Sequence, residues 1–463
     1  MFDARASYGR TLFVACGSSF LAFLDVTITN LALPAVGRDF DGVAIADLSW
    51  VVTLYTVVFA ALLAPAGRLA DVIGRRRLLS AGILVFTLAS LGAAAAPTYE
   101  ALLAARTVQG IGAALLLPAS LAYVLSDSPP ERRPAAIGLW SASAAMAAAI
   151  GPAVGGVLVD AGGWRWLFCI NVPVGAWLLY DTLRLPRVSG SGSGWPDWLG
   201  TTLLAGGVLS VVLGMTQGDQ WGWADPRTLA ALVVGLLACV VAVFRSAVHP
   251  RPALATHLWR SRTYVAANVV SAWFGASLFV WLLVGVLFVT TFWGYSELEA
   301  GLAMSPGGVV AALIGIGVSR AKRRVSLRAL VTIGSIVLTL TGGVVGIWLP
   351  EEPAFLAFWL PVGIVSGAAV GAVSVGVSSA AALAVSPVDF ASATGLNVAI
   401  RQIGGAIGVA VMAAVLSSSA PGDIDAYRKV YLLCGAATLV SAVAGAYLVW
   451  PGVRTPVKQP ADG

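Results

Sequence analysis

Residues 20–34, FLAFLDVTITNLALP, form an apolar run of the kind that crosses a lipid bilayer, yet they contain a carboxylate, Asp25. Between Arg10 and Arg38, Asp25 is the only charged residue. A bilayer-spanning helix needs roughly 20 predominantly apolar residues. Because an ionisable group inside a membrane is costly, Asp25 either interrupts a span or has a function within one.

The rest of the chain has the same character. It has 463 residues, of which 58% are hydrophobic and only 11% are charged, whereas a soluble domain carries about 25% charged residues. Apolar stretches of span length recur from end to end, and their richness in Gly and Ala suits helices rather than barrel strands. We therefore predict an all-α polytopic membrane protein whose first span is an uncleaved helix.

Fourteen transmembrane helices are predicted, and their even number places both termini on one side. Of the 28 Lys and Arg, five fall in outside segments and two, Arg106 and Arg401, within spans, which leaves 21 for the cytoplasmic segments. This asymmetry predicts a multi-pass protein of the cell membrane with both termini cytoplasmic. The expected spans lie near residues 11–34, 48–69, 78–97, 101–125, 135–159, 166–184, 198–216, 228–245, 264–292, 300–318, 329–349, 354–385, 394–418 and 428–450.

A flexible Gly/Ser segment, LPRVSGSGSGWPDW (185–198), separates six predicted spans from eight. The stretches AIGLWSASAAMAAAIG (136–151) and ATGLNVAIRQIGGAIG (393–408) share two glycines, a leucine and an isoleucine at one constant offset, which indicates two related halves. The predicted domains are an N-terminal six-helix lobe (1–184), a linker with two extra helices (185–262), and a C-terminal six-helix lobe with a short cytoplasmic tail (263–463).

The connection GRLADVIGRRRLL (67–79) between spans two and three combines glycines, one acid and three arginines. Gly67 and Gly74 allow a tight reversal. Asp71 lies at the end of a helix, where the macrodipole disfavours negative charge. It should therefore pair with a basic side chain or with the N-terminus of another helix. A solvated, positively charged loop is the alternative, and the arginines alone fit it.

Two membrane charges fall at similar depth. Asp25 lies roughly 12 Å and Arg106 roughly 8 Å from the outer surface at 1.5 Å per residue, which predicts that they meet. Arg106 could instead extend to the surface, but Asp25 is too short to do so. Arg401 lies about eight residues into span thirteen; it could also extend to the surface, and Asp389 is a possible partner.

The small residues of span five predict a special helix face. Gly151, Gly155 and Gly156 leave nearly bare backbone on one side, and Pro152 removes a backbone hydrogen bond and favours a bend. Ordinary close packing and a bending or sliding seam both fit this pattern.

Several motifs together resemble the major facilitator superfamily. The 67–79 connection is similar to its signature loop, although Val72 stands where a basic residue is common. RTVQGIGAALLLP (106–118) and AAAIGPAVGG (147–156) resemble its fourth-helix motif and the fifth-helix motif of its exporters. LDVTITNLALP (24–34), GGWRWLFCINVPVG (162–175) and GLNVAIRQIGGAIG (395–408) resemble signatures of the 14-helix drug:proton antiporter branch. The residues that match the signature loop are Gly67, Leu69, Ala70, Asp71, Gly74, Arg75 and Arg76.

The resemblance implies a major facilitator fold, in which two six-helix lobes alternate between inward-open and outward-open states and the two extra helices lie outside the core. The signature loop would be a conformational latch, with Glu131 a plausible partner for Arg75. When a latch of this kind is weakened by a few kcal/mol, the populations of the inward-open and outward-open states shift. The latch candidates are Gly67, Asp71, Gly74, Arg75, Arg76 and Glu131; the cavity or substrate candidates are Asn30, Tyr55, Gln109, Trp273, Trp281, Asn397 and Arg401.

The leading hypothesis is a proton-coupled antiporter that exports lipophilic small molecules by alternating access. Asp25 would bind and release the proton, because burial favours its neutral form and Arg106 its charged form. Of the 22 acidic residues, Asp25 is the only one deep in a predicted span. This scarcity disfavours multiple cationic substrates and makes a neutral or anionic substrate credible.

Two alternatives are a transporter of a specific metabolite, coupled to protons or not, and a non-transporting membrane receptor. Enzyme chemistry has little support, because His249 and His257 lie in a loop and the four cysteines fall in spans without metal-ligand spacing. No phosphate-binding glycine loop with its lysine occurs. We expect no metal, no cofactor and no nucleic-acid partner, and a monomer that contacts lipid, protons and its substrate.

Overall fold

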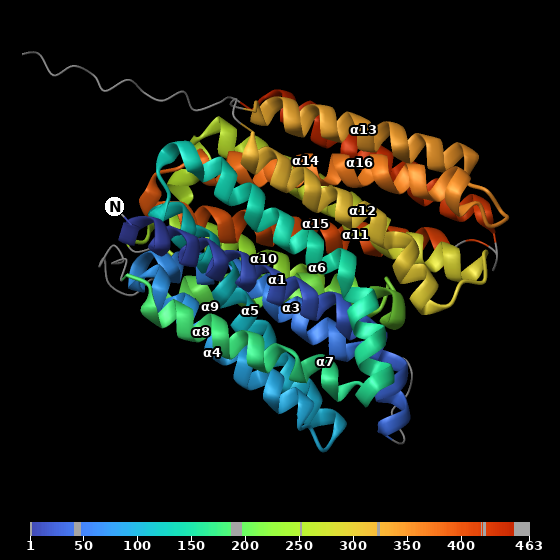
Figure 1. Cartoon of the computed structure of the whole chain (residues 1–463), viewed down its shortest axis with the longest axis horizontal. Coiled ribbons are helices and arrows are strands. Elements are labelled where there is room, and N and C mark those ends of the chain that lie inside the picture. The colour runs from blue at the N-terminus through green and yellow to red at the C-terminus, as the bar shows by residue number, and fades with distance from the viewer. Residues whose placement is uncertain are drawn as a thin grey trace, which may run out of the picture.

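The computed structural model describes residues 2–40, 48–186, 197–250, 252–321, 325–417, 419 and 423–448. Every regular element in these ranges is a helix, and the helices form one elongated bundle (Figure 1). We call the end of the bundle at which α1 begins the near end and the opposite end the far end. The Gly/Ser segment 187–196 and the basic residues Lys322, Arg323 and Arg324 lie outside the described residues.

Within the described residues, 14 helical segments are long and apolar enough to cross a membrane, as the sequence predicts. Most boundaries agree with the predicted spans to within a few residues. The helices are α1 (Phe2–Asp39), α3 (Trp50–Ile73), α4 (Arg75–Ala94), α5 (Tyr99–Asp127), α6 (Arg133–Gly162), α7 (Arg165–Cys169), α8 (Asn171–Arg184), α9 (Trp198–Trp221), α10 (Pro226–Val248), α11 (Arg262–Thr291), α12 (Glu297–Arg320), α13 (Leu327–Trp348), α14 (Leu360–Leu383), α15 (Phe390–Ser417) and α16 (Ile424–Ala446).

Short helical turns complete several spans. The turn η1 (Pro130–Arg132) precedes α6, η2 (Thr256–Arg260) precedes α11, η3 (Phe355–Trp359) leads into α14, and η4 (Pro387–Asp389) leads into α15. The sixth span consists of α7 and α8 together.

The one positive φ in the 67–79 connection is that of Gly74, at 104°. Gly74 ends α3 and allows α4 to start at the next residue.

The helices pack as two groups. α1, α3, α4, α5, α6 and α8 pack on one another, and so do α11, α12, α13, α14, α15 and α16. The groups meet along two seams, α6 against α12 and α3 against α15. We call these groups the N-terminal and C-terminal lobes.

Both seams depend on glycine. On α12, a Cβ added at Gly308 would lie 2.6 Å from the Cβ of Ala149 on α6, and one at Gly301 would lie 2.5 Å from the Cβ of Pro152. At the second seam, a Cβ added at Gly67 of α3 would lie 2.3 Å from the carbonyl oxygen of Ala391. Backbones therefore touch across the seams, which is how helices associate closely in lipid.

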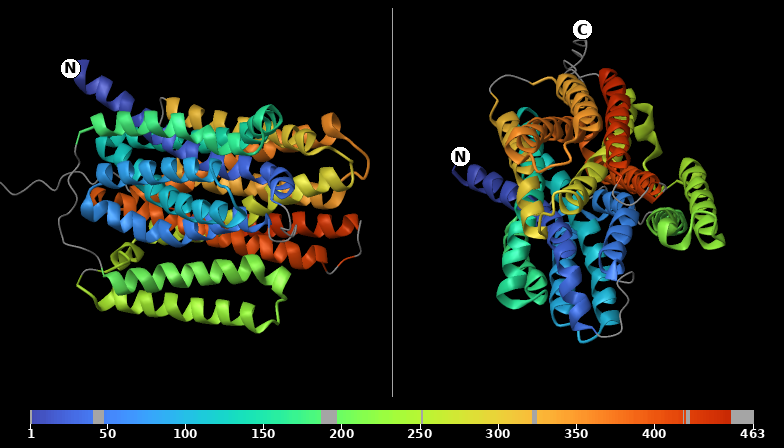
Figure 2. Two further views of the ribbon diagram at one scale, coloured as in Figure 1. Left: turned by 90° about the horizontal axis from the view of Figure 1, so that it is seen from below. Right: turned by 90° about the vertical axis from the view of Figure 1, so that its right-hand side faces the viewer.

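The α9–α10 hairpin stands at the margin of the bundle (Figure 2). α9 packs on α3 and α15 and so covers that seam, whereas α10 packs mainly on α9. Leu204 and Val208 of α9 share a hydrophobic cluster with Leu396 and Ile403 of α15. The α6–α12 seam lies on another side of the bundle, next to α1 (Figure 1).

An ion pair joins the base of the hairpin. Arg245 near the end of α10 donates from Nε and Nη2 to the carboxylate of Asp197, which precedes α9. These hydrogen bonds hold the pKa of Asp197 below its ordinary value.

Substitution at the α6–α12 seam should be costly. We expect Gly308→Val to lower the Tm of the purified protein in detergent, because overpacking costs about 1–3 kcal/mol. Gly317→Val is the matched control on the same helix, since a Cβ at Gly317 would meet nothing within 4 Å. Equal Tm values for the two variants would contradict this account of the seam.

The hairpin pair should make stability depend on pH. A carboxyl with a depressed pKa in the folded state stabilises above its unfolded pKa, about 3.9, and loses that contribution as pH falls through the folded pKa. The fall in Tm below about pH 4 should thus be smaller in Asp197→Asn than in the parent, by about 2 °C or less for one pair whose arginine is partly exposed. Asp225→Asn, which keeps the cap of α10, should leave the fall unchanged.

Candidate functional site

The carboxylate of Asp25 lies at the centre of a polar network inside the N-terminal lobe. Its Oδ2 accepts a hydrogen bond from Arg106 Nη1 at 2.6 Å. Its Oδ1 accepts from Gln109 Nε2 at 2.8 Å and from Asn171 Nδ2 at 2.9 Å. Asp25 and Arg106 are both fully buried. The two charges that the sequence places at similar depth thus form an ion pair.

Arg106 is fixed from several sides. It donates from Nε to the carbonyl of Val51 at 2.9 Å and from Nη1 to Gln109 Oε1 at 2.6 Å. Its guanidinium carbon lies 4.4 Å from the ring centroid of Tyr55 and 5.6 Å from that of Phe168, a cation–π arrangement. Tyr55, predicted as a cavity residue, is therefore part of this network.

The network is not saturated. Arg106 Nη2 and Asn171 Oδ1 are buried without a hydrogen-bond partner among the described residues. A buried polar atom that lacks a hydrogen-bond partner lowers the stability of the fold. Two polar atoms of the network around the Asp25 carboxylate therefore remain without a partner among the described residues.

The remaining cavity candidates lie apart from this network. Asn397 on α15 donates to Ser271 Oγ at 2.8 Å and to Asn268 Oδ1 at 3.1 Å, both on α11. Arg401 lies one turn further along α15. Asn30 lies in α1, but its side chain is outside the described residues.

The two aromatic candidates on α11 have different surroundings. Trp273 is 45% exposed, and it lies two residues from Gly275, whose Cβ position faces Arg401; two residues along a helix is about a half-turn, so Trp273 points away from the interior. Trp281 packs edge-on against Tyr431 of α16, with ring centroids 5.0 Å apart. The sequence could not show in which direction each of these side chains points, because both sides of α11 are apolar.

At the near end, Asp71 joins the two lobes. Its Oδ2 accepts from the backbone N and the Oγ of Ser392, each at 2.7 Å, and its Oδ1 from the backbone N of Ala391 at 3.3 Å. These donors are in the first turn of α15, where the helix dipole favours an anion. Asp71 also accepts from Arg75 Nη2 at 2.9 Å. Both kinds of partner expected for Asp71 are therefore present.

Arg75 extends the same contact. It donates to the carbonyl of Pro387, in η4 next to α15, and to Ser126 Oγ on α5. Its guanidinium carbon lies 5.7 Å from the ring centroid of Phe390. Glu131, the expected partner, is exposed on η1, and the ion pair that Arg75 makes within the described residues is with Asp71. The i,i+4 spacing of Asp71 and Arg75 in the sequence is the signal that indicates this ion pair.

Three other latch candidates have separate positions. Gly67 touches the backbone of Ala391, and Gly74 provides the turn between α3 and α4. Arg76 donates to the carbonyl of Leu183 at the end of α8, within its own lobe. Close by, His257 Nε2 lies 3.0 Å from Asp389 Oδ2, so Asp389 pairs with η2 and not with Arg401.

The span-five residues all lie in α6, which runs unbroken through Pro152. Gly151 faces α1, where an added Cβ would lie 2.1 Å from Thr27 Oγ1. Pro152 contacts Gly301 of α12, Gly155 is buried, and a Cβ at Gly156 would lie 3.4 Å from Leu298. The motif therefore lies between α1 and the seam with α12.

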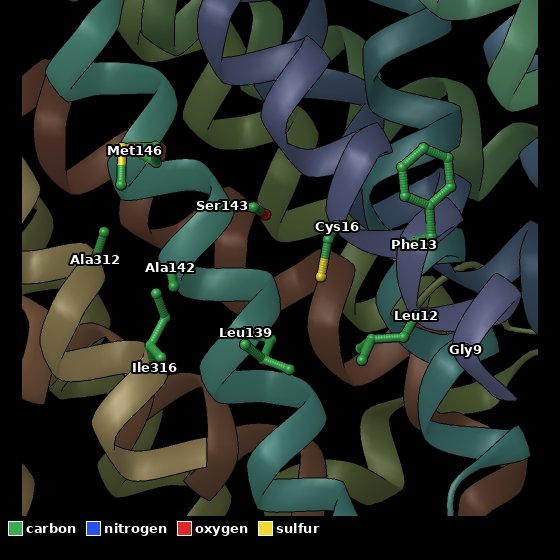
Figure 3. Close-up of a pocket in the computed structure, with 10 residues that line it drawn as sticks. All are labelled: Gly9, Leu12, Phe13, Cys16, Leu139, Ala142, Ser143, Met146, Ala312 and Ile316. Carbon is green, nitrogen blue, oxygen red and sulfur yellow. The ribbon is translucent and has the colours of Figure 1, made fainter. Parts of the chain in front are cut away.

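A groove of about 410 Å³ lies in the near half of the bundle between α1, α6 and α12 (Figure 3). Its lining is almost entirely apolar, with one hydroxyl and one thiol. Phe13 on its rim is 45% exposed. The lining residues are Gly9, Leu12, Phe13, Cys16, Leu139, Ala142, Ser143, Met146, Ala312 and Ile316.

Asn171 and His257 are site residues that the sequence prediction missed. Asn171 lies within GGWRWLFCINVPVG (162–175), where a lone amide in an apolar helix was the available signal. His257 had no such signal, because its partner Asp389 is 132 residues away.

Comparison with known proteins places this geometry in a family. The sequence profile of the Major Facilitator Superfamily matches residues 15–373. The chain is 32% identical over 432 residues to the methylenomycin A resistance protein of Streptomyces coelicolor, covering 93% of this chain and 90% of that protein. It is 33% identical to the puromycin resistance protein pur8 of Streptomyces alboniger, covering 96% and 87%. It is 32% identical to the cephamycin export protein CmcT of Amycolatopsis lactamdurans, covering 89% and 86%.

Solved structures share the fold. The human organic anion transporter MFSD10 superposes with a TM-score of 0.70 at 16% identity, over 95% of this chain and 99% of that chain. The proton:xylose symporter XylE superposes with a TM-score of 0.66 at 13% identity, over 95% of both chains. At such identities the likeness concerns the fold.

The contact at Asp71 should be measurable in solution. We expect Asp71→Asn to speed hydrogen–deuterium exchange of the Ala391 and Ser392 amides about tenfold or more, because it removes the charge from their acceptor. Asp160→Asn, which neutralises an exposed carboxylate at the end of α6, is the control. Unchanged exchange in Asp71→Asn would show that this contact does not hold the lobes together.

Proposed function

The chain belongs to the Major Facilitator Superfamily, and from this premise we propose that it is a proton-coupled antiporter that exports lipophilic small molecules. The observation that carries the proposal is the buried Asp25–Arg106 pair. The names of several relatives concern antibiotic resistance or export, which supports the direction of transport and the class of cargo.

The proton-coupling step follows from the surroundings of Asp25. A carboxylate with three hydrogen-bond donors is stable as an anion while the network is closed. If Arg106 turns toward another acceptor, the buried carboxylate loses its counter-charge and takes up a proton, since an unpaired charge is costly there. Proton binding at Asp25 would thus be linked to the position of Arg106, and through Val51 and Tyr55 to α3.

The latch would transmit this change. α3 carries Val51 and Tyr55 beside the ion pair and Asp71 at its other end, on the contact with α15. A shift of α3 that accompanies protonation would strain the Asp71 contacts and favour opening at the near end. We assign Asp71 and Arg75 as the conformational latch on this basis, and the glycine-lined α6–α12 seam as the surface on which the lobes move.

The near end would face the cytoplasm. Arg75, Arg132, Arg260 and Arg320 lie there, at the ends of four different helices or turns, as the positive-inside rule requires. The apolar groove between α1, α6 and α12 would then open to the cytoplasmic leaflet, where a lipophilic cargo collects. Localisation in the cell membrane and a monomeric state are part of the same proposal.

The first test is a search for cargo. An exporter-deficient bacterial strain that expresses the chain should tolerate more of one or several lipophilic antibiotics, with puromycin and methylenomycin A in the panel. The same strain carrying an empty vector is the comparison. No change in susceptibility to any compound would count against the export function.

The second test concerns Asp25. With the cargo so found, we expect Asp25→Asn to abolish transport driven by a pH gradient in proteoliposomes while cargo exchange without a gradient continues. Asp160→Asn should retain both activities. Loss of exchange together with driven transport would show that Asp25 supports the fold, and unchanged driven transport would remove it from proton coupling.

A further inference from the structure

Arg401 is a cation in the thirteenth span for which the described residues provide no partner. The thirteenth span covers Pro387–Ser417, so Arg401 lies about 21 Å from its near end at 1.5 Å per residue. Arg401 is therefore near the middle of this segment, where an arginine side chain has the longest way to the membrane surface. No hydrogen bond, ion pair or aromatic contact of the Arg401 side chain occurs among the described residues.

Arg106 shows what the same side chain looks like when it is satisfied. It has a carboxylate, an amide oxygen, a carbonyl and a tyrosine ring around it. The acids nearest to Arg401 in the sequence or at membrane depth are already engaged: Asp389 with His257, Asp71 with the start of α15, and Asp25 with Arg106. The described part of the chain therefore offers Arg401 no counter-charge.

The direction of Arg401 follows from its neighbours on α15. Leu396 and Ile403 pack in the cluster with the α9 hairpin, and Gly395 faces Leu63 of α3. Arg401 is about 200° from Ile403 around the helix, and its Cγ lies 3.0 Å from the Cβ position of Gly275 on α11. The side chain is thus on the inner side of α15, away from the hairpin and from exposed Trp273.

The backbone around Arg401 is held firmly. A Cβ added at Gly404 would lie 2.0 Å from the carbonyl oxygen of Ala272, and one at Gly275 would lie 2.2 Å from that of Arg401. One turn earlier, Asn397 is hydrogen-bonded to Asn268 and Ser271. These contacts fix the backbone of Arg401 and the start of its side chain, while its guanidinium has no partner among the described residues, which is costly in a membrane interior. A cation in this situation is suited to a counter-ion that comes from outside the chain.

We propose that Arg401 binds the negatively charged group, a carboxylate or similar oxyanion, of the transported molecule. This deepens the proposed export function and rests on it: the cargo class would be lipophilic anions. A guanidinium forms paired hydrogen bonds with a carboxylate that an ammonium cannot match. Asp25 and Arg401 would then have separate tasks, the first with the proton and the second with the cargo.

Equilibrium binding to the full chain in nanodiscs tests the site without requiring transport. The probes are fluorescein with further lipophilic carboxylates, and ethidium as a lipophilic cation. We expect Arg401→Gln to weaken fluorescein binding about tenfold or more and Arg401→Lys to weaken it less. Ethidium binding should not change. Arg328→Gln, which removes an exposed arginine near the start of α13, should bind both dyes like the parent.

Several results would overturn the site. They are normal carboxylate binding by Arg401→Gln, an equal loss of both dyes, and a parent protein that binds ethidium but no carboxylate. An inorganic anion offers the same charge as the cargo, so the assay is repeated with gluconate in place of chloride; fluorescein binding that requires chloride would assign Arg401 to the inorganic ion instead.

Flux measurements separate this proposal from the one on which it rests. If the parent binds carboxylates through Arg401 but moves nothing across proteoliposomes, the site stands and the export function fails. If the parent exports a neutral or cationic compound and binds no carboxylate, the export function stands and the anion site fails.

Discussion

A charge inside a lipid layer has no water to solvate it, and the N-terminal lobe is arranged around that constraint at Asp25 and Arg106. The two side chains neutralise each other at 2.6 Å. α5 supplies Arg106 and Gln109, α8 supplies Asn171, and α3 supplies a carbonyl and the ring of Tyr55. Four helices of one lobe are therefore fixed relative to one another by one ion pair. Any change in its protonation reaches all of them.

The two seams between the lobes differ in physical character. The α3–α15 seam ends in hydrogen bonds that Asp71 accepts and Arg75 donates, and each of these is either made or broken. The α6–α12 seam has small residues and backbone in contact, with Gly301 and Gly308 against Pro152 and Ala149. Apart from one hydrogen bond, from Ser305 Oγ of α12 to the carbonyl of Ala149 at 2.8 Å, these contacts permit small displacements without the loss of a specific bond. The hairpin covers the first seam, and an apolar groove lies beside the second.

The sequence predicted those features of the fold that depend on local composition. The fourteen spans follow from apolar length, and the meeting of Asp25 with Arg106 follows from similar depth and the cost of lone charges. The sequence could not predict how each helix is rotated about its own axis, because Gly- and Ala-rich helices have weak polar faces. Trp273 thus turned out to face outward, and Arg75 pairs with Asp71 and not with Glu131. The contact of His257 with Asp389 needed the tertiary fold.

The charge of Arg401, for which the described part of the chain provides no counter-charge, also has an electrical consequence. A charge at mid-span lies where the membrane potential changes, and moving one elementary charge through the whole layer involves about 2.3 kcal/mol per 100 mV. A lobe movement that displaces Arg401 through part of the field therefore involves a fraction of that work while the site is empty. With an anion bound, the pair is neutral and the same movement involves almost none. Voltage would act on the return of the empty carrier and leave the loaded step nearly untouched.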